Sequence, residues 1–377
     1  MAGFECATGY NRHRQWIDQI CATHHDRRIM EDYTALYSLG ILVAREGVRW
    51  PLIDKGGTYD FSSLDPFLTR ARYVGMQLIF DLFHYGYPED LDPMTPEFVE
   101  RFAAYCHAVA THVRKNMDGP FFFTPVNEPS YLAWAGGDAC LFAPHLCGES
   151  FSLKVNLIRA AIAGINAIRD VIPNARMVNV DPLCRVATPT DHPELEDEVR
   201  YFNENVVYEG WDMLAGRFMP ELGGSPQHLD IIGANYYWTN QWEHGRPGSI
   251  VDEDDPRWVP LSRLLADLHT RYRQEIVLTE TAHRDEHRGR HLEWVADEVE
   301  EALNNGVPIQ GICIYPVLGM PEWHEPGTWT RMGLWDVAED GNRFLHEPSA
   351  RALRYGQRNL ENLAIPKELQ FENPFLG

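Results

Sequence analysis

The sequence predicts an α/β fold, a single (β/α)8 (TIM) barrel in which eight parallel strands alternate with helices. Short apolar runs recur along the chain, as in strands that are buried on both faces of a parallel sheet. Longer segments with helical periodicity separate them, and several end at a glycine. Eight alternations with short connections indicate one barrel wrapped in helices, a fold that commonly exceeds about 250 residues as one domain.

The eight alternations can be placed along the chain of 377 residues. The predicted strands lie within residues 1–8, 41–50, 77–88, 121–126, 175–182, 228–238, 274–284 and 307–319. The predicted helices cover residues 26–40, 61–75, 96–116, 150–173, 192–217, 257–272, 287–306 and 347–360. We therefore expect one catalytic domain over residues 1–377, with 363–377 as a Pro-containing tail on its surface.

Composition and charge narrow the range of possible partners, ligands and cellular locations. With 55 acidic and 33 basic side chains the net charge is −22, which disfavours nucleic acid and anionic membranes as partners and is compatible with a neutral ligand such as a sugar. No uninterrupted apolar stretch approaches the roughly 18 to 20 residues of a membrane span, and the N-terminus lacks an apolar signal region. We expect a soluble, cytoplasmic protein.

The cysteine and histidine patterns do not predict a metal site. Seven cysteines without a CxxC pair argue against a disulfide framework and a structural zinc site. His24, His25 and Asp26 are adjacent, but neighbouring residues rarely ligate one ion together, and we expect Asp26 to cap the helix that starts there. We expect neither a metal nor a cofactor.

Residues 121–134 contain the first candidate catalytic carboxylate, around which we place the other candidate site residues. Phe121–Phe123 opens a short buried strand, which ends where Asn127 and Glu128 begin. Pro129 stops the strand and favours an extended Glu128, followed by a loop over 129–148. The Glu128 carboxylate would then stand at the C-terminal edge of the strand, where barrels of this class place their chemistry.

A second carboxylate, Glu280, also follows an apolar strand directly. Glycoside hydrolysis needs such a pair, because one carboxyl donates a proton to the departing oxygen and another attacks or stabilises an oxocarbenium-like centre. If the strand count is right, the two carboxylates share one rim with other polar side chains, namely Glu5, Arg45, His84, Asn127, Asn235, Tyr236 and the loop 315–323.

Six ordered segments carry a resemblance to a known family. TPVNEP is similar to the Asn-Glu-Pro motif of retaining β-glycosidases of glycoside hydrolase clan A, and LTET to the second glutamate motif. LFHYGYP, IGANYYW, YPVLGMPEW and WTRMGLWDV resemble further motifs of family 1, the β-glucosidases and β-galactosidases. The resemblance extends from about Arg45 to Asp336 and implies a barrel glycosidase without settling the sugar.

The resemblance implies roles for the two glutamates and their neighbours. Glu128 would be the general acid/base and Glu280 the nucleophile. Asn127 would hydrogen-bond the 2-hydroxyl of the sugar. Tyr236 would hold and tune Glu280, and Arg45 would keep that glutamate ionised. A structural role stays open for each, such as a barrel ion pair for Arg45 or simple packing for Tyr236.

The remaining implied substrate-binding residues are His84 and Glu322, which would bind sugar hydroxyls, and Trp323 or Trp329, which would stack on the ring. A core histidine and a tryptophan wall are the structural alternatives. Glu322 also argues against a 6-phosphosugar, because a carboxylate at that position would repel phosphate.

The chain departs from the family pattern at several places. The glutamine of the QxEG motif has no clear equivalent, and Glu5 would put a charge in that neighbourhood. Tyr85 and Tyr315 replace tryptophans, so the sugar pocket is expected to differ. The chain is also shorter than typical members, which predicts trimmed loops around the leaving-group sites.

These features predict a retaining β-glycosidase that cleaves a short β-glycoside or small glycoconjugate through a glycosyl-enzyme intermediate. One alternative with the same fold is a transglycosylase that favours a sugar or alcohol acceptor over water. Another, from a different class, is a barrel that binds glycans or partner proteins with little catalysis.

Overall fold

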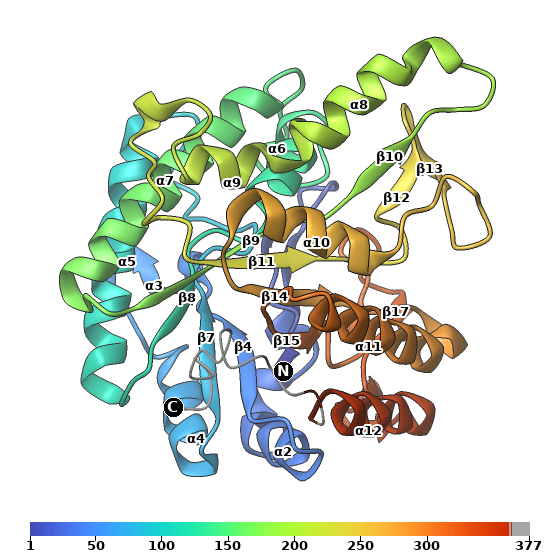
Figure 1. The fold of residues 1–377 in the computed structure, drawn as a ribbon. Coiled ribbons are helices and arrows are strands. Elements are labelled where there is room, and N and C mark those ends of the chain that lie inside the picture. Colours follow the sequence, from blue (N-terminus) through green and yellow to red (C-terminus); the bar gives the residue numbers. More distant parts are fainter. Residues whose placement is uncertain (362, 364–377) are drawn as a thin grey trace.

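Residues 1–361 and 363 are described by the computed structural model, which has a closed barrel of eight parallel strands at its centre (Figure 1). The strands follow one another around the barrel in chain order. They are β1 (Ala2–Gly3), β4 (Val43–Gly47), β7 (Gln77–Asp81), β8 (Phe122–Thr124), β9 (Arg176–Pro182), β11 (Ile231–Asn235), β14 (Ile276–Thr281) and β15 (Ile309–Ile314). Each lies inside a predicted segment, so the predicted fold class is confirmed; the predicted tail lies outside the described residues apart from residue 363.

Helices surround the barrel (Figure 1), and the smaller strands form separate two- and three-stranded sheets outside it. The helices are α1 (Gln19–Ala22), α2 (His25–Ser38), α3 (Trp50–Ile53), α4 (Asp65–Val74), α5 (Pro96–Asn116), α6 (Pro129–Gly137), α7 (Ser150–Val171), α8 (Glu196–Glu204), α9 (Glu209–Leu214), α10 (Leu261–Tyr272), α11 (Arg288–Asn304) and α12 (Glu347–Glu361). The smaller strands are β2 (Thr8–Tyr10), β3 (Trp16–Asp18), β5 (Asp54–Lys55), β6 (Thr58–Tyr59), β10 (Arg185–Ala187), β12 (Gln241–Glu243), β13 (Arg246–Ile250), β16 (Met320–Pro321), β17 (Trp329–Thr330), β18 (Trp335–Val337) and β19 (Arg343–Leu345).

The predicted helix over 192–217 is wrong as one element. It begins with a short 3-10 turn at Pro193–Leu195, and a second one at Val206–Tyr208 separates α8 from α9. The break falls at Asn205, whose backbone leaves the helical region (φ −130°, ψ −60°). Asparagine followed by two valines has low helix propensity, which explains why the helix ends there.

Alternation along the strands fills the barrel. Ile79 and Phe122 point inward and pack with valines and isoleucines of neighbouring strands. Phe80 and Phe123, the next residues along, belong to the larger core between strands and helices. Because side chains fill the interior of an eight-stranded barrel, a ligand can bind only at its ends.

Helix α7 is long and apolar enough to cross a membrane by length and composition, although Lys154 and Arg159 interrupt its sequence. However, 72% of its most apolar 18-residue window is buried inside the protein. Its apolar face packs on α5 and α6 in the outer layer of the barrel. This burial is typical of a core helix in a globular domain.

A buried ion-pair cluster fixes α2 against β4. His25 Nδ1 lies 2.7 Å from Asp32 Oδ2, and His25 Nε2 lies 3.0 Å from Glu46 Oε1 on β4. Tyr33 also donates a hydrogen bond to Glu46, over 2.8 Å. The predicted cap by Asp26 is wrong: the residue before the helix is His24, in a left-handed conformation (φ 59°), and no side chain caps the start. His25 instead serves to hold β4 in place.

This cluster predicts a pH-dependent stability. Burial by itself would lower the pKa of His25, but the carboxylates of Glu46 and Asp32 outweigh it and raise the pKa to about 9, from 6.5. A raised folded-state pKa contributes stability that is complete below pH 6.5 and is lost as the pH rises through 9. We expect His25→Gln to lower the free energy of unfolding by about 3 kcal/mol near neutral pH and to flatten this alkaline loss.

The test is urea unfolding at a series of pH values, with His107→Gln as the control. His107 is exposed on α5, so its replacement should leave both the midpoint and its pH dependence close to wild type. Equal pH dependence in wild type and His25→Gln would contradict the assigned role.

Candidate active site

The C-terminal ends of the barrel strands bring the two predicted catalytic carboxylates to one buried rim. Glu128 follows β8 and is 8% exposed, whereas Glu280 lies in β14 and is 4% exposed. Polar side chains from neighbouring strand ends are buried with them, and these are Glu5, Arg45, Asp81, His84, Asn127 and Asn235. The rigid strands therefore converge on one cluster of charged and amide groups.

Glu128 occupies the turn from β8 into α6. Its backbone is left-handed (φ 43°, ψ 61°), so the predicted extended conformation is wrong. The segment after it is also helix rather than loop, because Pro129 begins α6 and fits the first helical position. A left-handed glutamate is costly, on the order of 1–3 kcal/mol, and such conformations are common where a side chain must be aimed at a site.

Two neutral donors hold the Glu128 carboxylate. Tyr85 Oη donates to Oε2 over 2.5 Å, and Asn235 Nδ2 donates to Oε1 over 2.9 Å. Burial, followed by the charge of Glu280, raises the pKa of Glu128 to about 8, against smaller lowering effects of the two hydrogen bonds. Glu128 is therefore protonated at neutral pH.

Glu280 has a cation for a partner instead. Arg45 Nη1 lies 2.6 Å from Glu280 Oε1, and Tyr237 Oη donates to Glu280 Oε2 over 2.8 Å. The other terminal nitrogen of Arg45 donates to Asp81 Oδ2 over 2.7 Å and to Asn127 Oδ1 over 2.5 Å. The Glu280 carboxylate is therefore paired with a buried guanidinium at contact distance. The two glutamates thus sit in opposite environments.

Tyr236 does not hold Glu280, and this part of the site prediction is wrong. Its hydroxyl accepts a hydrogen bond from Gln241 Nε2 over 2.9 Å, and its ring packs in the outer core near Trp294. Successive side chains of a strand point to opposite faces. Asn235 faces the site, so Tyr237, two residues on, shares its face, whereas Tyr236 points away.

His84 lies beside Asn127, and both face the same cluster. His84 Nδ1 lies 2.9 Å from Asp81 Oδ2, and Nε2 lies 3.3 Å from Asn127 Nδ2. Glu5 Oε1 is 3.7 Å from His84 Nε2. Glu5, which we expected near the position of the missing QxEG glutamine, thus lies beside His84 at the rim.

Glu322 and Trp323 belong to the loop after β15. Glu322 Oε1 accepts a hydrogen bond from Thr330 Oγ1 over 2.5 Å and lies 3.4 Å from Arg284 Nη2. The Trp323 ring meets the Tyr85 ring edge-on, with centroids 5.8 Å apart, which links it to the residue that binds Glu128. Its Nε1 is buried and has no hydrogen-bond partner among the described residues.

Trp329 is not brought into this cluster by any contact between described residues. It lies on β17, opposite Pro321, and is 36% exposed. Of the two tryptophans that the sequence offers as a stacking platform, Trp323 is therefore the one joined to the site.

The sequence patterns did not predict two residues of this arrangement, Asp81, which binds Arg45, and Tyr237, which binds Glu280. Gln19 is 2% exposed; its Nε2 donates to Pro321 O over 3.2 Å, and its Oε1 has no hydrogen-bond partner among the described residues.

Cys6, Asp81 and His84 also place potential metal-ligand atoms within 4.8 Å of one another. The Asp81 Oδ2 atom already faces both Arg45 and His84. The buried charge of Arg45 opposes a second cation at the same oxygen. We assign no metal to this group.

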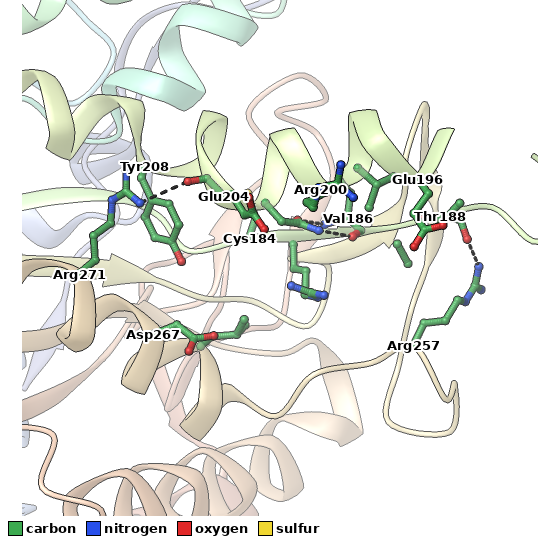
Figure 2. A pocket seen from close by; sticks show the side chains of 15 residues that line it. Cys184, Val186, Thr188, Glu196, Arg200, Glu204, Tyr208, Arg257, Asp267 and Arg271 are labelled. Atoms are coloured by element: carbon green, nitrogen blue, oxygen red, sulfur yellow. Dashed lines mark hydrogen bonds between the residues drawn. The ribbon is translucent and has the colours of Figure 1, made fainter. Parts of the chain in front are cut away.

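A cavity of about 710 Å³ lies elsewhere, between β10, α8 and α10 (Figure 2). Figure 2 shows Arg271 and Arg257 at its two ends, each donating to a backbone carbonyl, of Glu204 and Thr188 respectively. Its wall includes neither Glu128 nor Glu280, nor any other predicted site residue. The cavity therefore has no part in the assignment of the carboxylate pair.

Comparison with known proteins agrees with the fold. No protein-family model and no curated protein sequence matches the chain. A solved family 1 β-glucosidase from Thermotoga maritima superposes with a TM-score of 0.75 at 18% identity, covering 93% of each chain. The same kind of enzyme in complex with glucoimidazole gives a TM-score of 0.74 at 18% identity, over 95% of this chain and 97% of that one. A complex with isofagomine lactam gives 0.75 at 18% identity, over 94% and 95%. The chain therefore has the fold of family 1 β-glucosidases over nearly its whole length.

Proposed function

We propose that the protein is a retaining β-glycosidase that hydrolyses a short β-glycoside or small glycoconjugate, without a cofactor. The observation that carries this proposal is the unlike pair of buried carboxylates. Glu128 is held by neutral donors and has a pKa of about 8, whereas Glu280 is bound to the guanidinium of Arg45. A pair of acids in unequal environments is what general acid catalysis next to an anionic nucleophile requires.

In the first step, Glu280 attacks the anomeric carbon while Glu128 gives its proton to the departing glycosidic oxygen. The bond from carbon to the leaving oxygen breaks, and an ester between the sugar and Glu280 forms. Asn127, fixed by Arg45, would hydrogen-bond the 2-hydroxyl of the sugar. His84 and Glu322 would bind other hydroxyls of the sugar, and Trp323 would stack on its ring.

The second step uses the loss of charge on Glu280. The negative charge of Glu280 is one of the causes that raise the pKa of Glu128, and the ester removes it. The Glu128 pKa then falls, so that the carboxylate can take a proton from the attacking water. Water adds to the anomeric carbon, and Glu280 leaves as a carboxylate.

The comparisons support a small carbohydrate as the substrate. Two of the β-glucosidase structures with this fold are complexes with glucoimidazole and isofagomine lactam. A transglycosylase would use the same residues, and product analysis with added acceptor alcohols separates it from a hydrolase.

We expect Glu128→Gln and Glu280→Gln to lower sharply the turnover of whichever aryl β-glycoside the wild type cleaves best in a panel of gluco, galacto, manno, fuco and xylo compounds. Loss of the general acid should cost about 10²–10⁴-fold in kcat, and loss of the nucleophile at least as much. NMR of the first-formed sugar should show the β-anomer, as retention requires.

A first-formed α-anomer would contradict the retaining mechanism. Turnover that survives Glu280→Gln would contradict the assignment of the nucleophile. A wild type that binds sugars but cleaves none of the panel would favour the binding-barrel alternative.

The pH profile follows from Glu128. The proton donor is Glu128, whose pKa is near 8. We therefore expect kcat/KM to fall as the pH rises through about 8, and this alkaline loss should not begin at a much lower pH. The pH dependence of kcat/KM for an aryl glycoside measures this limb. Glu128→Gln should remove the limb from whatever residual activity remains, and a limb unchanged in that variant would contradict the role.

A matched pair of variants tests which tyrosine binds Glu280. Tyr237→Phe removes the hydroxyl that binds Glu280 and should lower kcat/KM by about 10- to 100-fold, the range for a hydrogen bond to a charged group. Tyr236→Phe removes a hydroxyl that binds Gln241 and Trp258 rather than Glu280 and should leave kcat/KM within a few fold of wild type. The reverse pattern in steady-state kinetics would restore Tyr236 as the tuning residue.

A further inference from the structure

Glu5 is a third buried carboxylate at the rim that holds Glu128 and Glu280. It lies two residues beyond β1 and is 5% exposed. Its Oε1 accepts a hydrogen bond from the Ala7 amide over 2.9 Å. Its Oε2 has no hydrogen-bond partner among the described residues, so one oxygen of the carboxylate is available to a ligand.

The nearest cation to Glu5 is His84, which Glu5 shares with Asp81. Among the described residues, the only basic group within 4.0 Å is His84 Nε2, at 3.7 Å, and the other ring nitrogen of His84 serves Asp81. Burial would lower the pKa of His84, but Cys6 and Asp81 raise it well above its usual value, so two cations, Arg45 and His84, face the three carboxylates of Glu5, Asp81 and Glu280. Burial raises the pKa of Glu5, against the lowering effect of His84. Keeping a poorly paired carboxylate in a buried site costs stability, so a bound partner is the simplest reason for it.

Glu5 lies on the sugar side of the proposed reaction. His84 Nε2, which is 3.7 Å from Glu5 Oε1, lies 3.3 Å from Asn127 Nδ2, and the proposed mechanism assigns Asn127 to the 2-hydroxyl of the ring. The proposed mechanism assigns His84 itself to sugar hydroxyls as well. The leaving group departs at Glu128, so a group that meets Glu5 belongs to the ring that Glu280 attacks.

We propose that Glu5 binds an ammonium group on this ring, so that the substrate is a β-glycoside of an amino sugar. This inference rests on the proposed glycosidase function and names its substrate class. An ammonium would neutralise the buried carboxylate with a charge-assisted hydrogen bond, whereas a hydroxyl would leave the charge in place. The net charge of −22 would also draw a cationic substrate toward the protein.

Binding measurements test the preference for an ammonium group independently of turnover. We would titrate the wild type by calorimetry at about pH 7, where an amine of ordinary basicity is largely protonated. The probes are glucose and galactose and their amino derivatives with the amine at C2, C3, C4 or C6. We expect at least one amino sugar to bind about 10-fold or more tightly than its neutral parent.

Glu5→Gln keeps the shape of the side chain and removes its charge. It should abolish the preference for the amino sugar and raise the thermal unfolding midpoint, because a poorly paired buried charge is gone. Glu100→Gln, an exposed change on α5, should keep both at wild-type values.

The proposal is overturned if no amino sugar binds more tightly than its parent, or if the preference survives Glu5→Gln. The parallel assay with the corresponding aryl β-glycosides separates the two levels of inference. If the wild type cleaves neutral glycosides without an amino preference, the glycosidase stands and the role of Glu5 fails. If it cleaves no glycoside but binds an amino sugar through Glu5, the glycosidase function fails and the ammonium site stands.

Discussion

The site depends on one buried cation, Arg45. Its side chain is 1% exposed and reaches carboxylate or amide oxygens on three other strand ends, those of Glu280, Asp81 and Asn127. A guanidinium without counter-charges could not be kept in this interior, and its partners would repel one another without it. Next to it on β4, Glu46 points outward and is fixed by His25 and Tyr33. β4 is therefore held from both faces. Because Arg45 lies on this strand and binds Glu280, the fixed strand also fixes the Glu280 carboxylate.

The second constraint is the difference between the two glutamates. Glu128 sits at a helix start in a left-handed conformation, and its carboxylate receives hydrogen bonds only from the neutral side chains of Tyr85 and Asn235 among the described residues. The proximity of Glu280 adds to burial in keeping the proton on Glu128. A change in the charge of one glutamate is thus felt by the other, and this coupling is what an acid that later acts as a base needs.

Much of this could be predicted from the sequence, because buried parallel strands leave a strong apolar pattern and their C-terminal ends are known to meet. Glu128 and Glu280 were found in this way, and the family motifs added roles that geometry alone does not give. The prediction that Tyr236 binds Glu280 was wrong because motif matching ignored the alternation of side chains along a strand. Asn235 faces the site, so the residue two positions on, Tyr237, faces it as well. Asp81 was missed because its partner Arg45 is 36 residues away, and local sequence carries no sign of such an ion pair. Asn205 broke a helix that an acidic, amphipathic pattern seemed to continue.

The covalent step on Glu280 is the central claim, and trapping tests it most directly. We would incubate the protein with 2-deoxy-2-fluoro-β-glycosyl fluorides of the sugar types that it cleaves. Fluorine at C2 slows both steps, whereas the good fluoride leaving group at C1 keeps formation of the glycosyl-enzyme faster than its release, so the ester accumulates. Mass spectrometry of the digested protein should find one sugar per chain, on the peptide that contains Glu280, with loss of activity in proportion. A label on another residue, or an inverted product with no trapped ester, would contradict the account.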